Sequence, residues 1–321
     1  MMLSRTIVLL SAVTVSLTTD LALASEREVT VHVEGVVLHA VLTTPDGASR
    51  PPVALILAGS GPTDRDGNSA AGIHTDMYKK LAESLNAAGI ATLRPDKRGA
   101  GRSTTTQPEA SMTIGGLIND AAAWITWLNN PANDLGKVAV IGHSEGALVG
   151  LGAALKTPVA AYVSVAGAGE NIADTLTRQL HSNPNNPPAL LQEADQIIAA
   201  LRAGQMVQQV SPSLMVLFRP SVQPYLISWM RLDPAIMLAQ LQTPALIAQG
   251  EHDLQVTLQD AHKLSAAQPK AQLRLITEMN HVLVDAPTDP ASNFATYSQP
   301  SLPLSTSFLA ALTTFLKSTL W

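Results

Sequence analysis

The chain has 321 residues, of which 46% are hydrophobic and 14% are charged, and its net charge at pH 7 is −5. These values are typical of one large α/β domain with enough apolar side chains for a sizeable core, and they exclude a disordered or fibrous protein. Lysine and arginine form no block along the chain, so we expect no nucleic-acid partner.

Residues 1–24 have the pattern of a secretory signal peptide. Arg5 precedes an apolar run over residues 6–17, and the tripeptide at residues 22–24, Ala-Leu-Ala, is a small-residue cleavage site. The apolar run is too short to span a bilayer. We therefore expect a secreted protein, periplasmic in a Gram-negative host, that begins near Ser25 and has no stable membrane anchor. A retained anchor is the alternative.

The chain contains no cysteine. Disulfides, thiolate zinc sites and a lipid attached through cysteine are therefore excluded, and stability after export must come from core packing. The sequence also lacks the helix-borne histidine pair of metal-dependent hydrolases, which argues against metal-assisted hydrolysis.

The first expected element is a β-hairpin over residues 29–44, where apolar residues alternate with polar ones around Glu34-Gly35. An unbroken apolar strand at residues 53–58 then leads into the glycine-rich loop "AGSGPTDRDGN". Residues 78–88 predict an amphipathic helix that Gly89 ends.

Strands and helices continue to alternate through the middle of the chain. Strands are expected at residues 90–93, 138–141 and 159–165, and helices at residues 114–128 and 147–155. Unbroken apolar strands that alternate with helices predict a mostly parallel sheet with helices on both faces. Ligands in such sheets bind at the carboxyl ends of the strands.

The alternation stops between residues 171 and 242, which contain helical patterns and the proline-rich "HSNPNNPP" but no convincing strand. We interpret residues 171–242 as a helical insertion between two parts of one α/β core, residues 25–170 and 243–321. The second part is expected to add two strands and two helices, at residues 245–248, 258–266, 271–277 and 308–316.

The stretch "KVAVIGHSEGALVGLGAAL" places Ser144 in a Gly-x-Ser-x-Gly motif between a buried strand and a helix. The motif alone is weak evidence, so its position carries the argument. A tight turn there forces the serine into a strained conformation and presents its hydroxyl above the sheet, as in a nucleophile elbow. The alternative is a capping serine in an ordinary glycine-rich turn.

A serine hydroxyl becomes a nucleophile when a base takes its proton and an acid orients that base. The loop "QGEHDLQV" offers Asp253 as the acid, with Glu251 in reserve, and "EMNHVLV" offers His281 as the base. Both loops follow strands, and the order Ser144, Asp253, His281 is the one that an elbow serine requires. The alternatives are a helix cap for Asp253 and a backbone-satisfied loop residue for His281.

The backbone N–H groups of Ser60 and Glu145 are the expected oxyanion hole, because one follows an early strand and the other follows the nucleophile. The charged residues Asp64, Arg65 and Asp66 lie in the same glycine-rich loop as Ser60. We interpret these three as an ion-pair set that stiffens the loop.

The motifs "GHSEG", "GEHD" and "NHVLV", in this order, resemble those of the α/β-hydrolase superfamily, and "RPDKRGAGRS" resembles the loop after its fourth strand. The likeness covers the chain from Val29 to the C-terminus. Within the superfamily, "AGSGPTDRDGN" together with "GHSEG" is similar to bacterial carboxylesterases of the serine-aminopeptidase-like group. The resemblance implies an α/β-hydrolase fold, hydrolysis of small acyl esters through an acyl-serine, no metal or organic cofactor, and a cap over the active site.

The sequence departs from many esterases at two positions. Ala58 stands where a histidine often precedes the oxyanion glycine, and Glu145 brings a carboxylate close to the acyl site. The insertion also carries soft and aromatic residues that suit either an adaptable acyl pocket or simple helix packing: Met206, Met215, Phe218, Tyr225, Trp229, Met230 and Met237.

The favoured function is therefore a secreted serine esterase that acts on a small acyl ester. A peptidase or amidase is the alternative among enzymes, because the same residues cleave amides and Glu145 could bind a substrate amino group. A non-catalytic binding protein on the same scaffold is the alternative outside enzymes.

Overall fold

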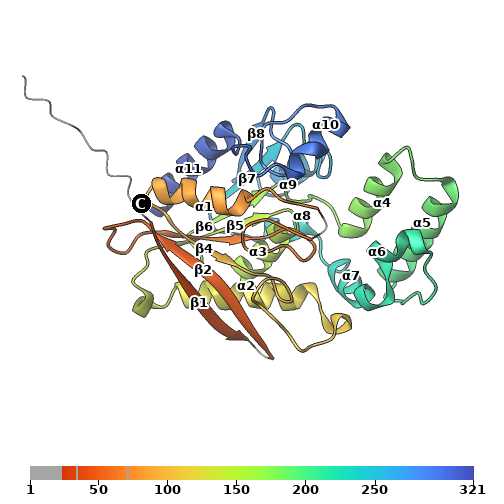
Figure 1. Cartoon of the computed structure of the whole chain (residues 1–321), viewed down its shortest axis with the longest axis horizontal. Coiled ribbons are helices and arrows are strands. Elements are labelled where there is room, and N and C mark those ends of the chain that lie inside the picture. Colours follow the sequence, from red (N-terminus) through yellow and green to blue (C-terminus); the bar gives the residue numbers. More distant parts are fainter. Residues whose placement is uncertain (1–23, 34, 71) are drawn as a thin grey trace, which may run out of the picture.

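The computed structural model describes residues 24–33, 35–70 and 72–321. At its centre lies an eight-stranded sheet with the strand order β1-β2-β4-β3-β5-β6-β7-β8 (Figure 1). β1 pairs with β2 and β2 with β4 in antiparallel fashion, and all further neighbours are parallel. The strands are β1 (Ser25–Val33), β2 (Val36–Thr44), β3 (Val53–Leu57), β4 (Ala91–Pro95), β5 (Val138–His143), β6 (Ala161–Val165), β7 (Ala245–Gly250) and β8 (Gln272–Ile276).

Helices cover both faces of this sheet. The helices of the core are α1 (Met77–Ala87), α2 (Ile114–Leu128), α3 (Glu145–Lys156), α8 (Pro234–Ala239), α9 (Leu258–Ala267), α10 (Pro290–Ala295) and α11 (Thr306–Leu320). Four more lie in the insertion: α4 (Ile172–Ser182), α5 (Pro188–Arg202), α6 (Met215–Phe218) and α7 (Gln223–Trp229).

Each central strand buries both of its faces. In β3, Val53, Leu55 and Leu57 pack with α2 and α3, whereas Ala54 and Ile56 pack with α1 and α11. Successive side chains of a strand point to opposite faces, so a strand between two helical layers is apolar throughout. The predicted α/β class, with a mostly parallel sheet covered on both faces, is confirmed.

The N-terminal hairpin is longer than its apolar alternation indicates. β1 begins at Ser25, and residues 25–28 pair with Val41–Thr44 of β2. The side chains of residues 25–28 are exposed, so this part of the edge strand carries no apolar pattern from which it could be predicted. Glu34 of the expected turn lies outside the described residues.

The expected signal peptide, residues 1–24, lies outside the described residues except for Ala24. Within the part of the chain that the structure describes, no helix has the length and apolar character needed to cross a membrane.

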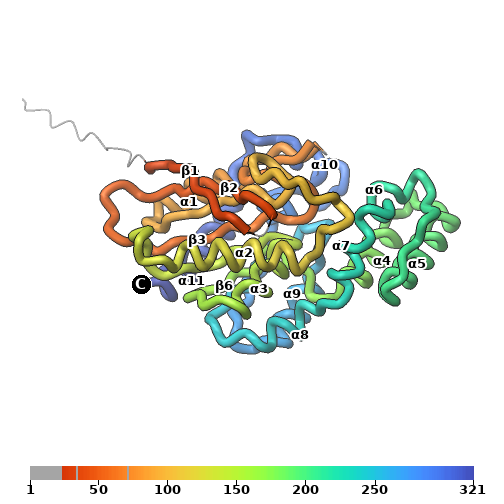
Figure 2. Tube along the Cα trace, turned by 90° about the horizontal axis from the view of Figure 1, so that it is seen from below, coloured from red at the N-terminus to blue at the C-terminus, as the bar shows by residue number. Residues whose placement is uncertain are grey.

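The insertion stands to one side of the sheet and has a small apolar core of its own (Figures 1 and 2). That core joins α4, α5, α6 and α7 through buried side chains such as Ile197, Phe218 and Leu226. α8 lies instead against α3 and α9, and Leu238 belongs to the main core. In space, the cap therefore consists of α4 to α7.

Candidate active site

Ser144 lies in the tight turn between β5 and α3, with φ 55° and ψ −121°. A positive φ is costly for a residue with a side chain and persists only where the surroundings impose it. Here they do so through close packing, because a Cβ on Gly142 would lie 2.2 Å from the Gly146 carbonyl oxygen and a Cβ on Gly146 2.3 Å from that of Leu57. The local geometry is that of a nucleophile elbow.

The glycine-rich loop after β3 passes directly over this serine. A Cβ on Gly59 would lie 3.2 Å from the Cβ of Ser144. Glycine at residue 59 therefore lets the loop backbone approach Ser144 more closely than another residue would.

Asp253 and His281 form a buried pair on the loops after β7 and β8. Oδ2 of Asp253 lies 2.8 Å from Nδ1 of His281, and Oδ1 of Asp253 accepts the backbone N–H groups of Gln255 and Val256 at 2.8 and 3.0 Å. Because a carboxylate accepts, Nδ1 of His281 is the donor and Nε2 of the neutral ring carries the lone pair of a base.

The surroundings of Asp253 favour its ionised form. Burial alone would raise the pKa of this carboxyl, but the charge and hydrogen bond of His281 and the two backbone N–H groups hold the pKa below its usual range. The helix that follows is capped by Thr257, so Asp253 is not its N-cap. Glu251, the reserve acid, is exposed.

A buried hydrogen-bond chain joins the glycine-rich loop, the elbow and the histidine loop. The Gly59 N–H donates to Tyr78 Oη at 2.9 Å, Tyr78 Oη lies 2.8 Å from His143 Nδ1, and His143 Nε2 lies 2.9 Å from the His281 carbonyl oxygen. The carbonyl can only accept, so Nε2 of His143 is protonated, Nδ1 accepts, and Tyr78 donates to it.

His143 is neutral at ordinary pH, since burial and the neighbouring His281 lower its pKa to about 3. The two imidazole rings lie 4.8 Å apart between centroids, which places His281 beside the residue that precedes the nucleophile. Within the described residues no hydrogen bond joins the Ser144 hydroxyl to His281. Catalytic hydrogen bonds are often long before a substrate is bound.

Ser60 and Glu145, the expected oxyanion donors, both lie close to Ser144 in the chain or in space, since Glu145 follows it directly and Gly59, the neighbour of Ser60, packs against it. Ser60 is on the exposed loop after β3, and Glu145 is the first residue of α3. In the described part of the chain, neither backbone N–H donates to a protein acceptor. The N–H groups of the first helical turn lack partners within the helix, so Glu145 N–H is available to bind a ligand.

The carboxylate of Glu145 is turned into the junction between core and cap. Lys97 Nζ donates to its Oε1 at 2.8 Å, and Tyr225 Oη of α7 donates to its Oε2 at 2.5 Å. Lys97 also donates to the Gly59 carbonyl oxygen. Gly59 is thus held through both its N–H and its C=O. These two hydrogen bonds fix the loop although residue 58 is alanine and not the histidine found in many esterases.

A cavity of about 240 Å³ lies between the glycine-rich loop, α2 and the cap. Its polar lining includes two groups, Lys97 with Glu145 and Tyr225, and the ion pair of Glu109 with Arg219. Both carboxylates that line it are therefore paired. Of the soft cap residues, Tyr225 lines this cavity, whereas Phe218 and Met230 are buried in the core of the cap and Met206 and Met215 are exposed.

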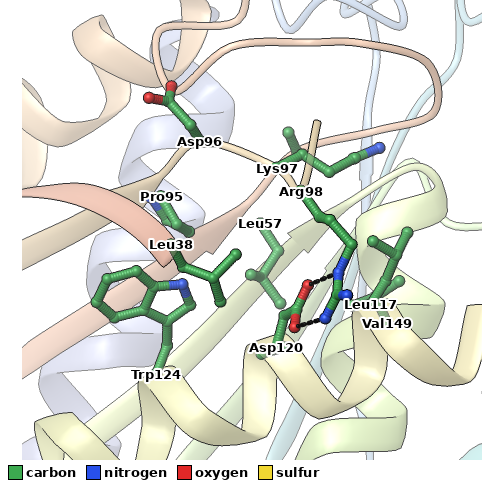
Figure 3. A pocket seen from close by; sticks show the side chains of 12 residues that line it. Leu38, Leu57, Pro95, Asp96, Lys97, Arg98, Leu117, Asp120, Trp124 and Val149 are labelled. Carbon is green, nitrogen blue, oxygen red and sulfur yellow. Dashed lines mark hydrogen bonds and ion pairs between the residues drawn. The ribbon is translucent and has the colours of Figure 1, made fainter. Parts of the chain in front are cut away.

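A second cavity, of about 40 Å³, lies between the sheet and α2 and shares Lys97, Arg98 and Leu117 with the first. Figure 3 shows Asp96, Lys97 and Arg98 leaving the loop after β4 in three different directions. Arg98 forms a two-point ion pair with Asp120 of α2. Asp96 accepts the backbone N–H groups of Arg65 and Arg102 at 3.0 and 2.8 Å.

The charged residues of the glycine-rich loop do not pair with one another as an ion-pair set: two of them pair with residues outside the loop, and Asp64 binds backbone N–H groups. Arg65 pairs with Asp96, and Asp66 pairs with Arg94. Asp64 Oδ1 accepts the backbone N–H groups of Asp66 and Asn68, each at 2.9 Å. Within the described residues no group of three or more His, Cys, Asp or Glu side chains is placed to hold a metal ion.

The sequence profile of the serine aminopeptidase family S33, a family of hydrolases, matches residues 70–287 of this chain. The chain belongs to this family. The matched region covers more than half of the chain, including the elbow and both loops that carry Asp253 and His281. The resemblance that the motifs indicated is confirmed.

Among characterised proteins, esterase EstD of Thermotoga maritima is 24% identical over 263 residues, which cover 81% of this chain and 60% of that relative. The chain therefore matches less than two thirds of the length of EstD.

Solved structures resemble this member of the family over nearly its whole length. Est1E of Butyrivibrio proteoclasticus, solved with ferulic acid, has a TM-score of 0.59 at 18% identity and covers 91% of this chain and 98% of its own. The α/β hydrolase GrgF of Penicillium sp. has a TM-score of 0.60 at 20% identity, with coverages of 92% and 99%. These likenesses confirm the α/β-hydrolase fold.

Sequence reasoning did not identify Tyr78, His143 and Lys97 as parts of the site. Lys97 lies in the motif "RPDKRGAGRS" and His143 in "GHSEG", but neither motif assigns these residues a role, and no motif contains Tyr78. The one available signal for Lys97 and His143 is their place beside strand ends, since Lys97 closely follows β4 and His143 ends β5.

The Asp253–His281 pair predicts that removing the charge of Asp253 lowers activity, whereas removing that of a nearby exposed carboxylate does not. Asp253→Asn should lower kcat for p-nitrophenyl acetate by about 10³- to 10⁴-fold, because an amide neither stabilises an imidazolium nor fixes the correct tautomer. Glu251→Gln, which alters an exposed carboxylate two residues away, is the matched control and should keep the wild-type kcat. Equal losses in both variants would contradict the pairing.

Because His143 is buried in its neutral form, we expect the stability of the protein to depend on pH. Its folded pKa of about 3 lies below an unfolded value of about 6.5, so the unfolded chain binds the proton first as the pH falls. The stability that the folded protein gains by keeping His143 neutral is therefore fully present above about pH 6.5 and is lost as the pH falls towards 3. From pH 8 to pH 5, His143 should lower the free energy of unfolding by about 2 kcal/mol, as measured by urea denaturation.

The variant His143→Asn separates this group from the other histidines. It is expected to be less stable at pH 8, and its free energy of unfolding should decrease less than that of the wild type between pH 8 and pH 5. Parallel curves for the two proteins would show that His143 does not titrate as proposed.

Proposed function

We propose that this protein is a serine ester hydrolase that uses Ser144, His281 and Asp253. The observation that carries the proposal is the buried Asp253–His281 hydrogen bond of 2.8 Å, set beside a serine in a strained turn at the start of a helix. Such a pair makes the imidazole a base on the side away from the carboxylate.

In the proposed reaction, Nε2 of His281 takes the hydroxyl proton of Ser144 while Oγ attacks the ester carbonyl carbon. The carbonyl oxygen becomes an oxyanion that accepts the N–H groups of Ser60 and Glu145. As the oxyanion collapses, the imidazolium gives its proton to the departing alcohol and an acyl-serine remains. Water then attacks this ester with His281 again as the base, and the carboxylic acid leaves with Ser144 restored.

Esters are favoured over aminoacyl substrates by the charges of the cavity. An aminopeptidase needs a carboxylate free to bind the substrate ammonium, but Glu145 is paired with Lys97 and Glu109 with Arg219. The Lys97–Glu145 pair is buried, with side chains 13% and 2% exposed, so breaking it to bind a substrate would leave a buried lysine unpaired, which is costly. The Glu109–Arg219 pair is exposed, and there the arginine only neutralises the carboxylate. The similarity to EstD, an esterase, supports the same substrate class, and we propose small acyl esters as substrates.

The first test is removal of the nucleophile. Ser144→Ala should abolish hydrolysis of p-nitrophenyl acetate, because no other group supplies the attacking oxygen. A fluorophosphonate probe should label the wild type at Ser144, as located by mass spectrometry of the digested protein, and should not label the variant. Undiminished turnover by Ser144→Ala would refute the mechanism, and a folded wild type that neither reacts nor labels would favour a binding protein.

Matched ester and amide substrates, with and without a free α-amino group, distinguish an esterase from an aminopeptidase. The wild type should hydrolyse a p-nitrophenyl ester faster than the matched p-nitroanilide, and a free α-amino group should not improve an amide substrate. Faster cleavage of leucine p-nitroanilide than of its N-acetylated form would instead identify an aminopeptidase.

We propose further that the protein is exported and cleaved near Ser25. The support is the charged, apolar and small-residue order of residues 1–24. N-terminal sequencing of the protein from the medium or the periplasm of its host should then find a start at or near Ser25. An intact Met1 on the exported protein, or retention in the cytoplasm, would refute the proposal.

A further inference from the structure

We propose that Lys97 is a positioning residue for the oxyanion hole, which it serves by binding the Gly59–Ser60 peptide group and the side chain of Glu145 at the same time. This inference rests on the proposed function, since it assigns a role within that reaction. The role is indirect, because Lys97 acts through the two residues whose N–H groups face the oxyanion.

The first contact of Lys97 determines the orientation of one donor. Its Nζ donates to the carbonyl oxygen of Gly59, and this C=O belongs to the same peptide group as the N–H of Ser60. A trans peptide is planar, and its C=O and N–H point in opposite directions. By binding the C=O, Lys97 therefore directs the Ser60 N–H away from itself and prevents the peptide group from rotating.

The same contact strengthens the donor. A hydrogen bond from an ammonium is charge-assisted, and it draws electron density from the carbonyl, so the N–H at the other end of the peptide becomes more positive. Hydrogen bonds in such chains strengthen one another by about 10–30%. The side chain of Lys97 is only 13% exposed, which limits screening of this effect by water.

The second contact involves the other donor. Lys97 Nζ lies 2.8 Å from Oε1 of Glu145, and Glu145 is the residue whose own N–H opens α3. Tyr225 of the cap binds the remaining oxygen of this carboxylate at 2.5 Å. One ammonium thus links the two residues that are expected to supply the oxyanion donors.

Lys97 is itself held on both sides by its neighbours in the loop after β4. Asp96 binds backbone and side chain of Arg65 in the glycine-rich loop, and Arg98 is paired with Asp120 of α2. Their side chains point away from that of Lys97 (Figure 3). The ammonium is therefore placed by a loop that is anchored at the residues before and after it.

A simpler explanation is that Lys97 only compensates the buried charge of Glu145. The two explanations differ in what happens at the Gly59–Ser60 peptide. If charge compensation is the whole role, removing both charges should restore normal function, whereas a positioning role requires the ammonium even when residue 145 is neutral.

The peptide group can be observed by itself. Gly59-Ser60 is the single Gly-Ser dipeptide of the 321-residue sequence, so labelling with ¹³C-carbonyl glycine and ¹⁵N-serine gives one cross-peak in an HNCO spectrum. Lys97→Met should move this peak to higher field in both heteronuclear dimensions, because the carbonyl loses its hydrogen bond. Glu145→Gln should leave the peak near its wild-type position, since Lys97 can still bind Gly59.

The kinetic test uses two lysine variants. Lys97→Met should lower kcat for p-nitrophenyl acetate by about 10- to 100-fold, with KM changed by less than about three-fold, because the loss concerns the transition state. The affinity for a trifluoromethyl ketone, which forms a hemiketal oxyanion on Ser144, should fall by a similar factor. Lys80→Met is the matched control, since Lys80 also donates to backbone carbonyls, those of Thr75 and Leu302, and it should keep the wild-type kcat.

Lys97→Met alone leaves the buried carboxylate of Glu145 without its lysine and could misfold for that reason. The double variant Lys97→Met/Glu145→Gln removes this ambiguity, because residue 145 is then neutral. It should remain as slow as Lys97→Met. Recovery of wild-type kcat in the double variant, an unmoved Gly59-Ser60 peak, or a loss confined to KM would each overturn the proposal. A wild type that hydrolyses no ester would overturn the proposed function together with it, whereas an active wild type with an unaffected Lys97→Met variant would overturn this inference alone.

Discussion

The packing of the first turn of α3 against the end of β3 is the constraint on which the candidate site depends. A Cβ on Gly146 would lie 2.3 Å from the carbonyl oxygen of Leu57, so the helix can approach this closely only because residue 146 is glycine. The approach forces the chain to turn sharply at Ser144, which takes up a positive φ. It also brings the start of α3 next to the loop that leaves β3, so Ser144 and both expected oxyanion donors lie close together.

Buried polar groups then hold the loops around this turn. Tyr78 and His143 connect Gly59 with the backbone of residue 281, and Asp253 holds the ring of the same histidine. Buried hydrogen bonds of this kind contribute modestly to stability when complete and are costly to break. The network therefore restricts three loops from distant parts of the chain to one arrangement.

The cap contacts the core through charged and hydroxyl groups near the 240 Å³ cavity. Arg219 and Ser221 of the cap bind Glu109, and Tyr225 binds Glu145. Because Glu109, Arg219, Tyr225 and Glu145 also line the cavity, a movement of the cap would change both the shape of the cavity and the surroundings of the Glu145 side chain.

The sequence by itself determined the α/β class, the order of the elements and three polar residues that follow strands, Ser144, Asp253 and His281. These features depend on local periodicity and on the rule that carboxyl ends of parallel strands meet at one edge. The exposed start of β1 at Ser25 was missed, because pairing of an edge strand there requires no apolar alternation.

Only the tertiary structure decided which side chains support the site. Lys97 and Glu145 are 48 residues apart, and Tyr78 and His143 are 65 apart, so no local pattern relates them. The ion pair of Glu145 with Lys97 also could not be inferred from the sequence. A glutamate directly after Ser144 could equally have had no partner and have bound the amino group of a substrate. Contacts between residues so far apart arise from the packing of whole elements, whereas a sequence pattern reports mainly the periodicity of each element alone.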